Sequence, residues 1–152
     1  MADTKADQIL DNLVTTLQGL TIANGYSLDV GLVSLKYKGL KNVSASGHPA
    51  IFILNMGEDL SPETNEEYSS DFNIWLACSF MPTGVDSDYV TEYNRWVGDI
   101  KKILLQDIRR GNSSFVETTL LRDVTPISDW SKSPIHFTVR IVVRFTFDKD
   151  SP

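Results

Sequence analysis

The residues best suited to chemistry in this 152-residue chain are six carboxylates in one short stretch, residues 57–71. Hard cations such as Mg²⁺ are held by several oxygen ligands of this kind, and a small nuclease could use two or three of them. Their spacing lacks the order of an EF-hand, and a long solvated loop explains the stretch more simply. The carboxylates are Glu58, Asp59, Glu63, Glu66, Glu67 and Asp71.

The rest of the chain carries no catalytic motif. It has no glycine-rich phosphate loop, no metal-type spacing of His or Cys, and no nucleophile elbow. Cys78 falls inside an apolar strand pattern, which is typical of packing rather than of a reactive thiolate. His48 and His136 fall in a loop and on the polar face of a strand. The sequence therefore predicts neither an enzyme nor a cofactor.

Charge and hydropathy limit the function further. The net charge is −6, from 20 acidic and 14 basic residues, whereas a protein that grips nucleic acid usually carries a basic footprint. No 18-residue stretch is apolar and uncharged, and the N-terminus lacks a basic-then-apolar signal. We therefore expect no membrane association and assembly in a cytoplasm. The length is that of one domain.

Two amphipathic helices are predicted. Apolar residues recur at helical spacing over residues 4–20, where Thr4 and Asp7 resemble a capping box. The second helix covers residues 89–108 and ends at Arg109, Arg110 and Gly111, with Asp86 or Ser87 as its cap.

Strand patterns fill most of the remaining sequence. Residues 28–37 change alternation phase beside Gly31, which predicts a β-bulge, and residues 38–49 are typical of a mobile loop. Further strands are predicted over residues 50–54, 72–80, 115–124 and 135–147. The element order predicts an α+β fold: a single domain with a mixed or antiparallel sheet, two main helices on one face and a long C-terminal strand.

The last strand raises a question of its own. Every odd position over residues 135–147 is apolar, and at about 3.3 Å per residue the strand would be about 43 Å long. Arg140 and Arg144 fall on its polar face. Trp75 likewise falls on the face of its strand opposite Ile74 and Leu76, so something other than the helices is expected to cover it.

Opposite charges are also separated along the chain. Residues 57–71 are purely acidic, whereas Lys36, Lys38 and Lys41 follow the first strand and two arginines lie on the last. Opposite signs on separate surfaces suit a head-to-tail contact between identical copies, which closes into a ring when the rotation permits. Two unrelated solvated patches are the alternative.

The order of elements resembles that of the tail terminator (tail completion) proteins of long-tailed bacteriophages, the family that includes the lambda-type minor tail protein U. The resemblance covers nearly the whole chain and has no single diagnostic motif. It rests on QILDNLVTTL (8–17), NGYSLDVGLV (24–33), PAIFIL (49–54), FNIWLACSF (72–80), YVTEYNRWVGDIKKIL (89–104), FVETTLLRDVTPI (115–127) and IHFTVRIVVRF (135–145).

This resemblance implies a structural virion protein without cofactors. Such proteins form hexameric rings on the tail tube, stop its polymerisation and present a docking surface to the head-side connector, while DNA passes through the lumen. The partners would be further copies of the chain, the tail tube protein and the connector, with assembly in the host cytoplasm. Arg140 and Arg144 would then meet carboxylates of a neighbour, and Trp75 and the acidic stretch would lie at subunit or tube contacts. A head–tail connector or other neck protein is the nearest alternative.

Overall fold

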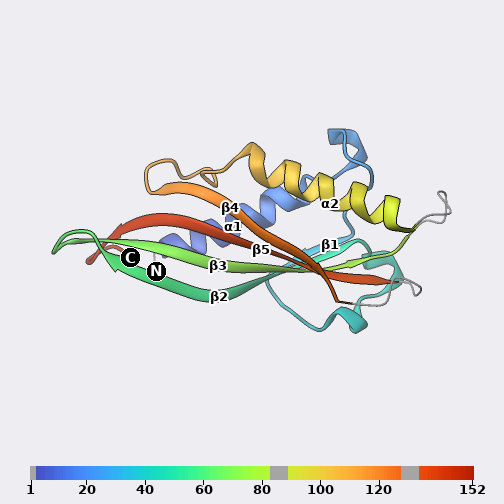
Figure 1. The fold of residues 1–152 in the computed structure, drawn as a ribbon, viewed down its shortest axis with the longest axis horizontal. Helices are drawn as coiled ribbons and strands as arrows, with labels where there is room; N and C mark the ends of the chain where they lie inside the picture. Colours follow the sequence, from blue (N-terminus) through green and yellow to red (C-terminus); the bar gives the residue numbers. More distant parts are fainter. Residues whose placement is uncertain (1–2, 83–88, 128–133) are drawn as a thin grey trace.

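Five strands form one twisted sheet, and both helices pack against one of its faces (Figure 1). The computed structural model describes residues 3–82, 89–127 and 134–152. The strand order is β1-β2-β3-β5-β4, with β1 parallel to β2 and all other neighbours antiparallel. The predicted α+β fold, with one domain and a mixed sheet, is confirmed. The strands are β1 (Leu32–Ser34), β2 (Ala50–Pro62), β3 (Glu67–Phe80), β4 (Val116–Pro126) and β5 (Ile135–Asp148).

The first helix, α1 (Lys5–Gln18), begins where the capping box was predicted. The Thr4 hydroxyl accepts a hydrogen bond from the Asp7 amide, and the Asp7 carboxylate accepts one from the Thr4 amide. The capping box thereby gives partners to two backbone amides that have none within the helix. Ile9, Leu13 and Leu17 are fully buried in the core, and Leu10 and Val14 of the same stripe are partly buried against it.

The second helix, α2 (Tyr89–Gln106), buries the predicted stripe from Tyr93 to Leu104 and ends close to the predicted place. The two end residues of the predicted stripe, Tyr89 and Ile108, are 36% and 40% exposed. Its proposed caps, Asp86 and Ser87, lie outside the described residues. Arg110 is fully buried at a positive φ of 52°, and its guanidinium donates hydrogen bonds to the carbonyl oxygens of Leu104 and Asp107. The Arg110 side chain therefore caps the last turn of α2. The run of basic residues in the sequence predicted that the helix ends here, but not that one of them caps it.

The two central strands explain the length of the C-terminal strand. β3 and β5 pair without a register shift from Glu67 opposite Asp148 to Phe80 opposite Ile135. Alternate residues of both strands face the helices and form the core. The long terminal strand that the alternation predicted is confirmed, and β3 is equally long.

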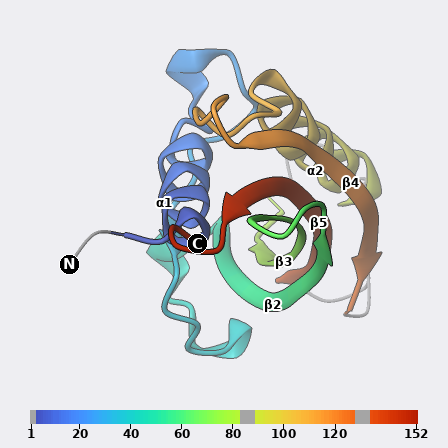
Figure 2. The same cartoon turned by 90° about the vertical axis from the view of Figure 1, so that its left-hand side faces the viewer.

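The predicted bulged strand over residues 28–37 is wrong: only Leu32–Ser34 are in β1. Position 31 requires glycine because of close packing and not because of a β-bulge. A Cβ atom there would lie 2.6 Å from the carbonyl carbon of Gly47. The segment that follows β1, residues 35–48, includes the 3₁₀ turns Leu40–Asn42 and Ala45–Gly47. The segment 35–48 lies on the side of the sheet away from α2 (Figure 2).

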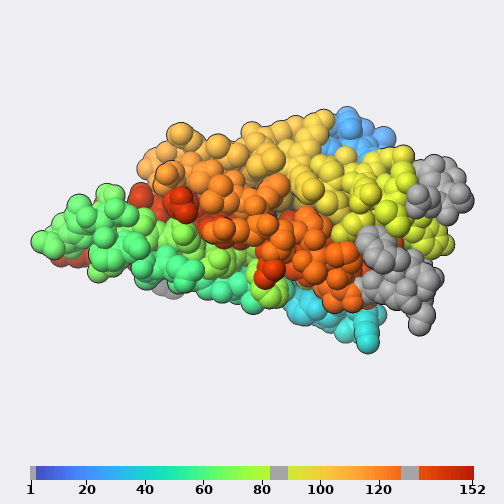
Figure 3. All heavy atoms as spheres, viewed as in Figure 1, coloured from blue at the N-terminus to red at the C-terminus, as the bar shows by residue number. Residues whose placement is uncertain are grey.

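The predicted acidic loop over residues 57–71 is also wrong. Those residues continue β2 and β3 as a hairpin, with a register shift in β2 between Asn55 and Glu58. Local sequence missed it because polar residues stand on both faces, whereas the pairing with β5 supplies backbone partners along the whole length of β3. This hairpin, residues 56–71, is called the arm below; it projects beyond the helices at one end of the molecule (Figures 1 and 3).

Candidate functional site

The arm carries all six predicted carboxylates, but the hairpin distributes them over different surfaces. Glu58 pairs with Phe72 in the register and so faces the helix side, whereas Asp59 and Asp71 pair with each other on the opposite face. Glu63 and Glu66 stand at the turn, whose backbone is closed by hydrogen bonds from the Glu63 and Thr64 amides to the Glu67 carbonyl. The arrangement presents acidic groups on every side of the arm rather than around one point.

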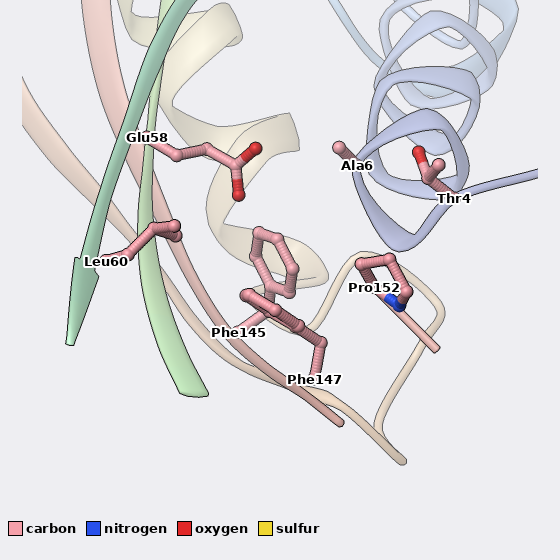
Figure 4. Close-up of a pocket in the computed structure, with 7 residues that line it drawn as sticks. All are labelled: Thr4, Ala6, Glu58, Leu60, Phe145, Phe147 and Pro152. Carbon is pink, nitrogen blue, oxygen red and sulfur yellow. The ribbon is translucent and has the colours of Figure 1, made fainter. Parts of the chain in front are cut away.

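The helix side of the arm forms an apolar groove against the start of α1 (Figure 4). Its volume is about 360 Å³. The Glu58 carboxylate is held there by a 2.6 Å hydrogen bond that it accepts from the Ser70 hydroxyl. Figure 4 shows the two phenylalanine rings between the strands and the chain ends. The lining residues are Thr4, Ala6, Glu58, Leu60, Phe145, Phe147 and Pro152.

An aromatic contact joins the arm to β5. Tyr68 and Phe147 are directly opposite in the register and stack with their ring centroids 5.6 Å apart and their planes 11° from parallel. Such cross-strand aromatic pairs stabilise a sheet beyond the area that they bury. Leu60 in the same region keeps 55% of its surface exposed, so the arm is well paired but poorly covered.

On the face away from the helices, the arm is tied to β5 by an ion pair. The Arg144 guanidinium donates two hydrogen bonds to the Asp71 carboxylate, at 2.8 and 3.4 Å. This pairing raises the pKa of Arg144. Asp59 accepts a 3.1 Å hydrogen bond from the Asn73 side-chain amide.

A second arginine lies on Trp75 in the same face. The Arg140 guanidinium carbon is 5.5 Å from the centre of the Trp75 ring, within the range of a cation–π contact. Arg140 also binds the Asp123 carboxylate of β4 through Nη2 at 2.5 Å and Nε at 2.7 Å. The hydrogen bond from Arg140 lowers the pKa of Asp123 and raises that of Arg140. These residues border a shallow hollow of about 220 Å³.

These contacts change the predicted role of Arg140 and Arg144. Arg140 pairs with Asp123 and Arg144 pairs with Asp71, so each arginine binds a carboxylate of its own chain and not one of a neighbouring subunit. Sequence reasoning missed Asp123 because a register shift in β4 between Leu121 and Asp123 sets which residue lies opposite Arg140. The arginines remain partly exposed, so this face is a preformed, charge-balanced surface rather than a set of free cations.

The chain covers only one end of this open face. Ala50, Phe52 and Ala77 are buried there beneath Leu40 and other residues that include part of segment 35–48. The segment is fastened by His48, whose Nε2 lies 2.8 Å from the Ser79 hydroxyl and whose Nδ1 lies 3.0 Å from the Ser44 carbonyl oxygen. Trp75 lies where this cover stops and is half-buried. The expectation that something other than the helices covers this face is therefore met in part by the chain itself.

The chemical inventory of the described residues is short. Within residues 3–82, 89–127 and 134–152, no three His, Cys, Asp or Glu side chains lie close enough together to hold a metal ion. Burial raises the pKa of the Cys78 thiol, which disfavours the reactive thiolate. No helix in the described ranges is long and apolar enough to cross a membrane. The nuclease alternative thus has no cluster of carboxylates in the described structure to support it.

Comparisons with known proteins do not indicate a family or a function for this chain. The chain matches no protein-family model and no curated protein.

Proposed function

We propose that this chain is a structural assembly protein that closes the head-proximal end of a phage tail tube as a ring of identical copies. The observation that carries the proposal is the arm. It extends the layer formed by β2, β3 and β5 beyond the helices. Its helix-facing Leu60 and the neighbouring Phe147 of β5 border an open groove instead of a core. A sheet surface that its own chain does not cover is typical of a subunit whose neighbours supply the missing cover.

The rest of the molecule supports a binding role in place of a catalytic one. The open sheet face presents Trp75 and two arginines held in fixed positions by cross-strand contacts, and preorganised aromatic and arginine side chains are the residues that interfaces favour. A ring of such subunits would meet the tail tube on one side and the head-side connector on the other.

The acidic balance supports passage of DNA through the ring. Each copy carries a net charge of −6, and a negative lumen repels phosphate and so keeps the DNA from sticking. In this proposal the protein needs no cofactor and binds DNA at no specific site.

Electron microscopy of the purified protein, alone and mixed with tail tubes of the same phage, tests the proposal. We expect rings that sit on the head-proximal end of the tubes and stop their growth. Rings that bind the portal side of capsids and leave tubes unaffected would instead identify a head–tail connector. A protein that stays monomeric and binds neither tubes nor capsids would overturn both.

A further inference from the structure

The arm combines exposed apolar side chains with unpaired carboxylates. Met56 is 45% exposed and Leu60 is 55% exposed. Glu66 pairs with Lys149, but within the described residues Glu63 and Glu67 form no ion pair. Residues 57–71 contain no basic side chain at all. Met56 lies at the base of the hairpin, whereas Leu60, Glu63 and Glu67 lie close to the turn. Leu60 and the two glutamates therefore give the tip of the arm a mixed apolar and acidic surface.

Residues 35–41 present the complementary combination. Leu35 is 43% exposed and Tyr37 is 51% exposed, and they alternate with Lys36 and Lys38. Tyr37 is held in place because its ring packs edge-on against Phe52 at 5.4 Å. No acidic residue occurs between positions 31 and 57. Within the described residues, none of the three lysines at 36, 38 and 41 forms an ion pair.

A groove adjoins these residues and gives the apolar side chains a place to bind. It has a volume of about 440 Å³ and lies between α1 and the free edge of β1. Val14 and Val33 form its apolar walls, and Asp11 contributes one carboxylate at the border. The remaining lining residues are Thr15, Ser34, Leu35 and Lys36.

The two surfaces lie far apart in one molecule. The tip of the arm forms one end of the long axis, whereas segment 35–48 lies below the other half of the sheet (Figure 1). The arm cannot reach residues 35–41 of its own chain, because the paired strands β2 and β3 separate the two regions along the long axis. Contact between these surfaces therefore requires a second copy, and it is necessarily head-to-tail.

We infer that the arm of one copy docks on residues 35–41 of the next, with Leu60 on the groove beside β1 and Glu63 and Glu67 opposite Lys36 and Lys38. This inference rests on the proposed function for its biological setting, since a ring needs one repeated head-to-tail contact. Apolar contact supplies affinity, and the charges fix the register and exclude arm-to-arm pairing.

The other free edge of the sheet is a poorer candidate for the contact. β4 is interrupted by register shifts between Val116 and Thr118 and between Leu121 and Asp123, and it ends at Pro126. Bulges and proline disfavour strand addition at an edge. A hairpin tip covers only part of the roughly 800 Å² per partner that a standard interface buries, so we expect a contact that depends on salt and concentration.

Reciprocal charge reversal tests the inference in the full-length protein. One variant carries Glu63→Lys and Glu67→Lys, and the other carries Lys36→Glu and Lys38→Glu. The matched control is Lys101→Glu with Lys102→Glu on the exposed side of α2, which changes the net charge by the same amount as the second variant. Sedimentation velocity measures association, and circular dichroism checks that each variant is folded.

We expect each reversed variant alone to associate about tenfold more weakly than the wild type or more, while the control is little changed. An equal mixture of the two reversed variants should associate again, because each arm then meets a segment of opposite charge on the other variant. Alternating assemblies in the mixture would establish that these two surfaces face each other.

Other results would overturn the inference in distinguishable ways. If the reversed variants associate as the wild type does, the contact lies elsewhere and the proposed function survives. The pairing of these two surfaces is equally excluded if the reversed variants lose association and mixing does not restore it. A wild type that stays monomeric at every concentration overturns the inference and counts against the ring. If the mixed variants assemble again but the assemblies do not bind tail tubes, the inferred contact is supported and the proposed function is wrong.

Discussion

The body of the molecule, where α1 and α2 cover the sheet, and the arm belong to the same sheet but are stabilised in different ways. In the body, Phe137 of β5 is completely buried and packs edge-on against Tyr93 of α2 at 5.1 Å. In the arm, Leu60 of β2 keeps more than half of its surface in solvent. The body is stabilised by burial, whereas the arm is maintained mainly by backbone pairing and a few aromatic and ionic contacts. Side chains in the arm are therefore free to serve association.

The largest difference should appear on truncating one apolar side chain in each region. Phe137→Ala should lower the free energy of unfolding by about 3–5 kcal/mol, because it removes a fully buried ring and leaves a cavity. Leu60→Ser should change it by no more than about 0.5 kcal/mol. Urea unfolding followed by circular dichroism measures both. Equal losses would mean that the arm is covered as fully as the body.

A smaller effect is expected for the aromatic pair that joins the arm to β5. Phe147→Ala should cost about 1 kcal/mol, because it removes the stacking on Tyr68 together with part of the groove wall. Thr146→Ala, on the other face of the same strand, is the control and should cost less. A loss as large as that of Phe137→Ala would place Phe147 in the core and shift the boundary between arm and body.

The ion pair on the open face should contribute less than the aromatic pair. A double-mutant cycle with Asp71→Asn and Arg144→Gln should show a weak favourable coupling, because both side chains are substantially exposed. The coupling should shrink as NaCl is raised, since solvent-exposed charges are screened. Strong coupling at high salt would instead indicate that this face is shielded from solvent.

The smallest effect concerns His136, which lies in the body beside segment 35–48. Burial lowers the pKa of His136 below its ordinary 6.5, and the positive charges of His48 and Lys41 lower it further. Between the folded pKa and about 6.5, His136 binds more protons in the unfolded chain than in the folded protein. The stability that this residue contributes is therefore fully present above about pH 6.5 and is lost as the pH falls through the lower folded pKa.

Unfolding measured from pH 8 to pH 5 should accordingly show a shallower decline in the His136→Gln variant than in the wild type. An arm substitution such as Ser69→Ala is the control and should keep the wild-type dependence. An unchanged slope in His136→Gln would assign the acid sensitivity to another group.

The sequence predicted the body far better than the arm. Ile9, Leu13 and Leu17 recur at a helical spacing that only a one-sided burial explains, and the alternation of β5 identifies its buried face without further information. The arm has polar residues on both faces and no such periodicity, so Asp59 and Asp71 looked like members of a loop. Its strands exist because β5 continues beside them, which is a long-range fact.

For the site residues, the sequence predicted the face of the sheet but not the contacts. The sequence placed Trp75, Arg140 and Arg144 on the polar face of the sheet, because in strands side-chain direction follows from parity alone. It did not determine their partners. Asp123 meets Arg140 only through a register shift in β4, and Asp71 meets Arg144 only through the continuous pairing of β3 with β5.

The sequence by itself therefore determined the helices, the fold class, the buried faces and the overall acidity, since these depend on residue type and local period. The tertiary structure alone decided that the acidic stretch is a projecting arm, that the arginines are already paired, and that acidic and basic surfaces stand far apart. These features depend on strand register and on contacts between distant residues, and no local pattern encodes a register that bulges can shift.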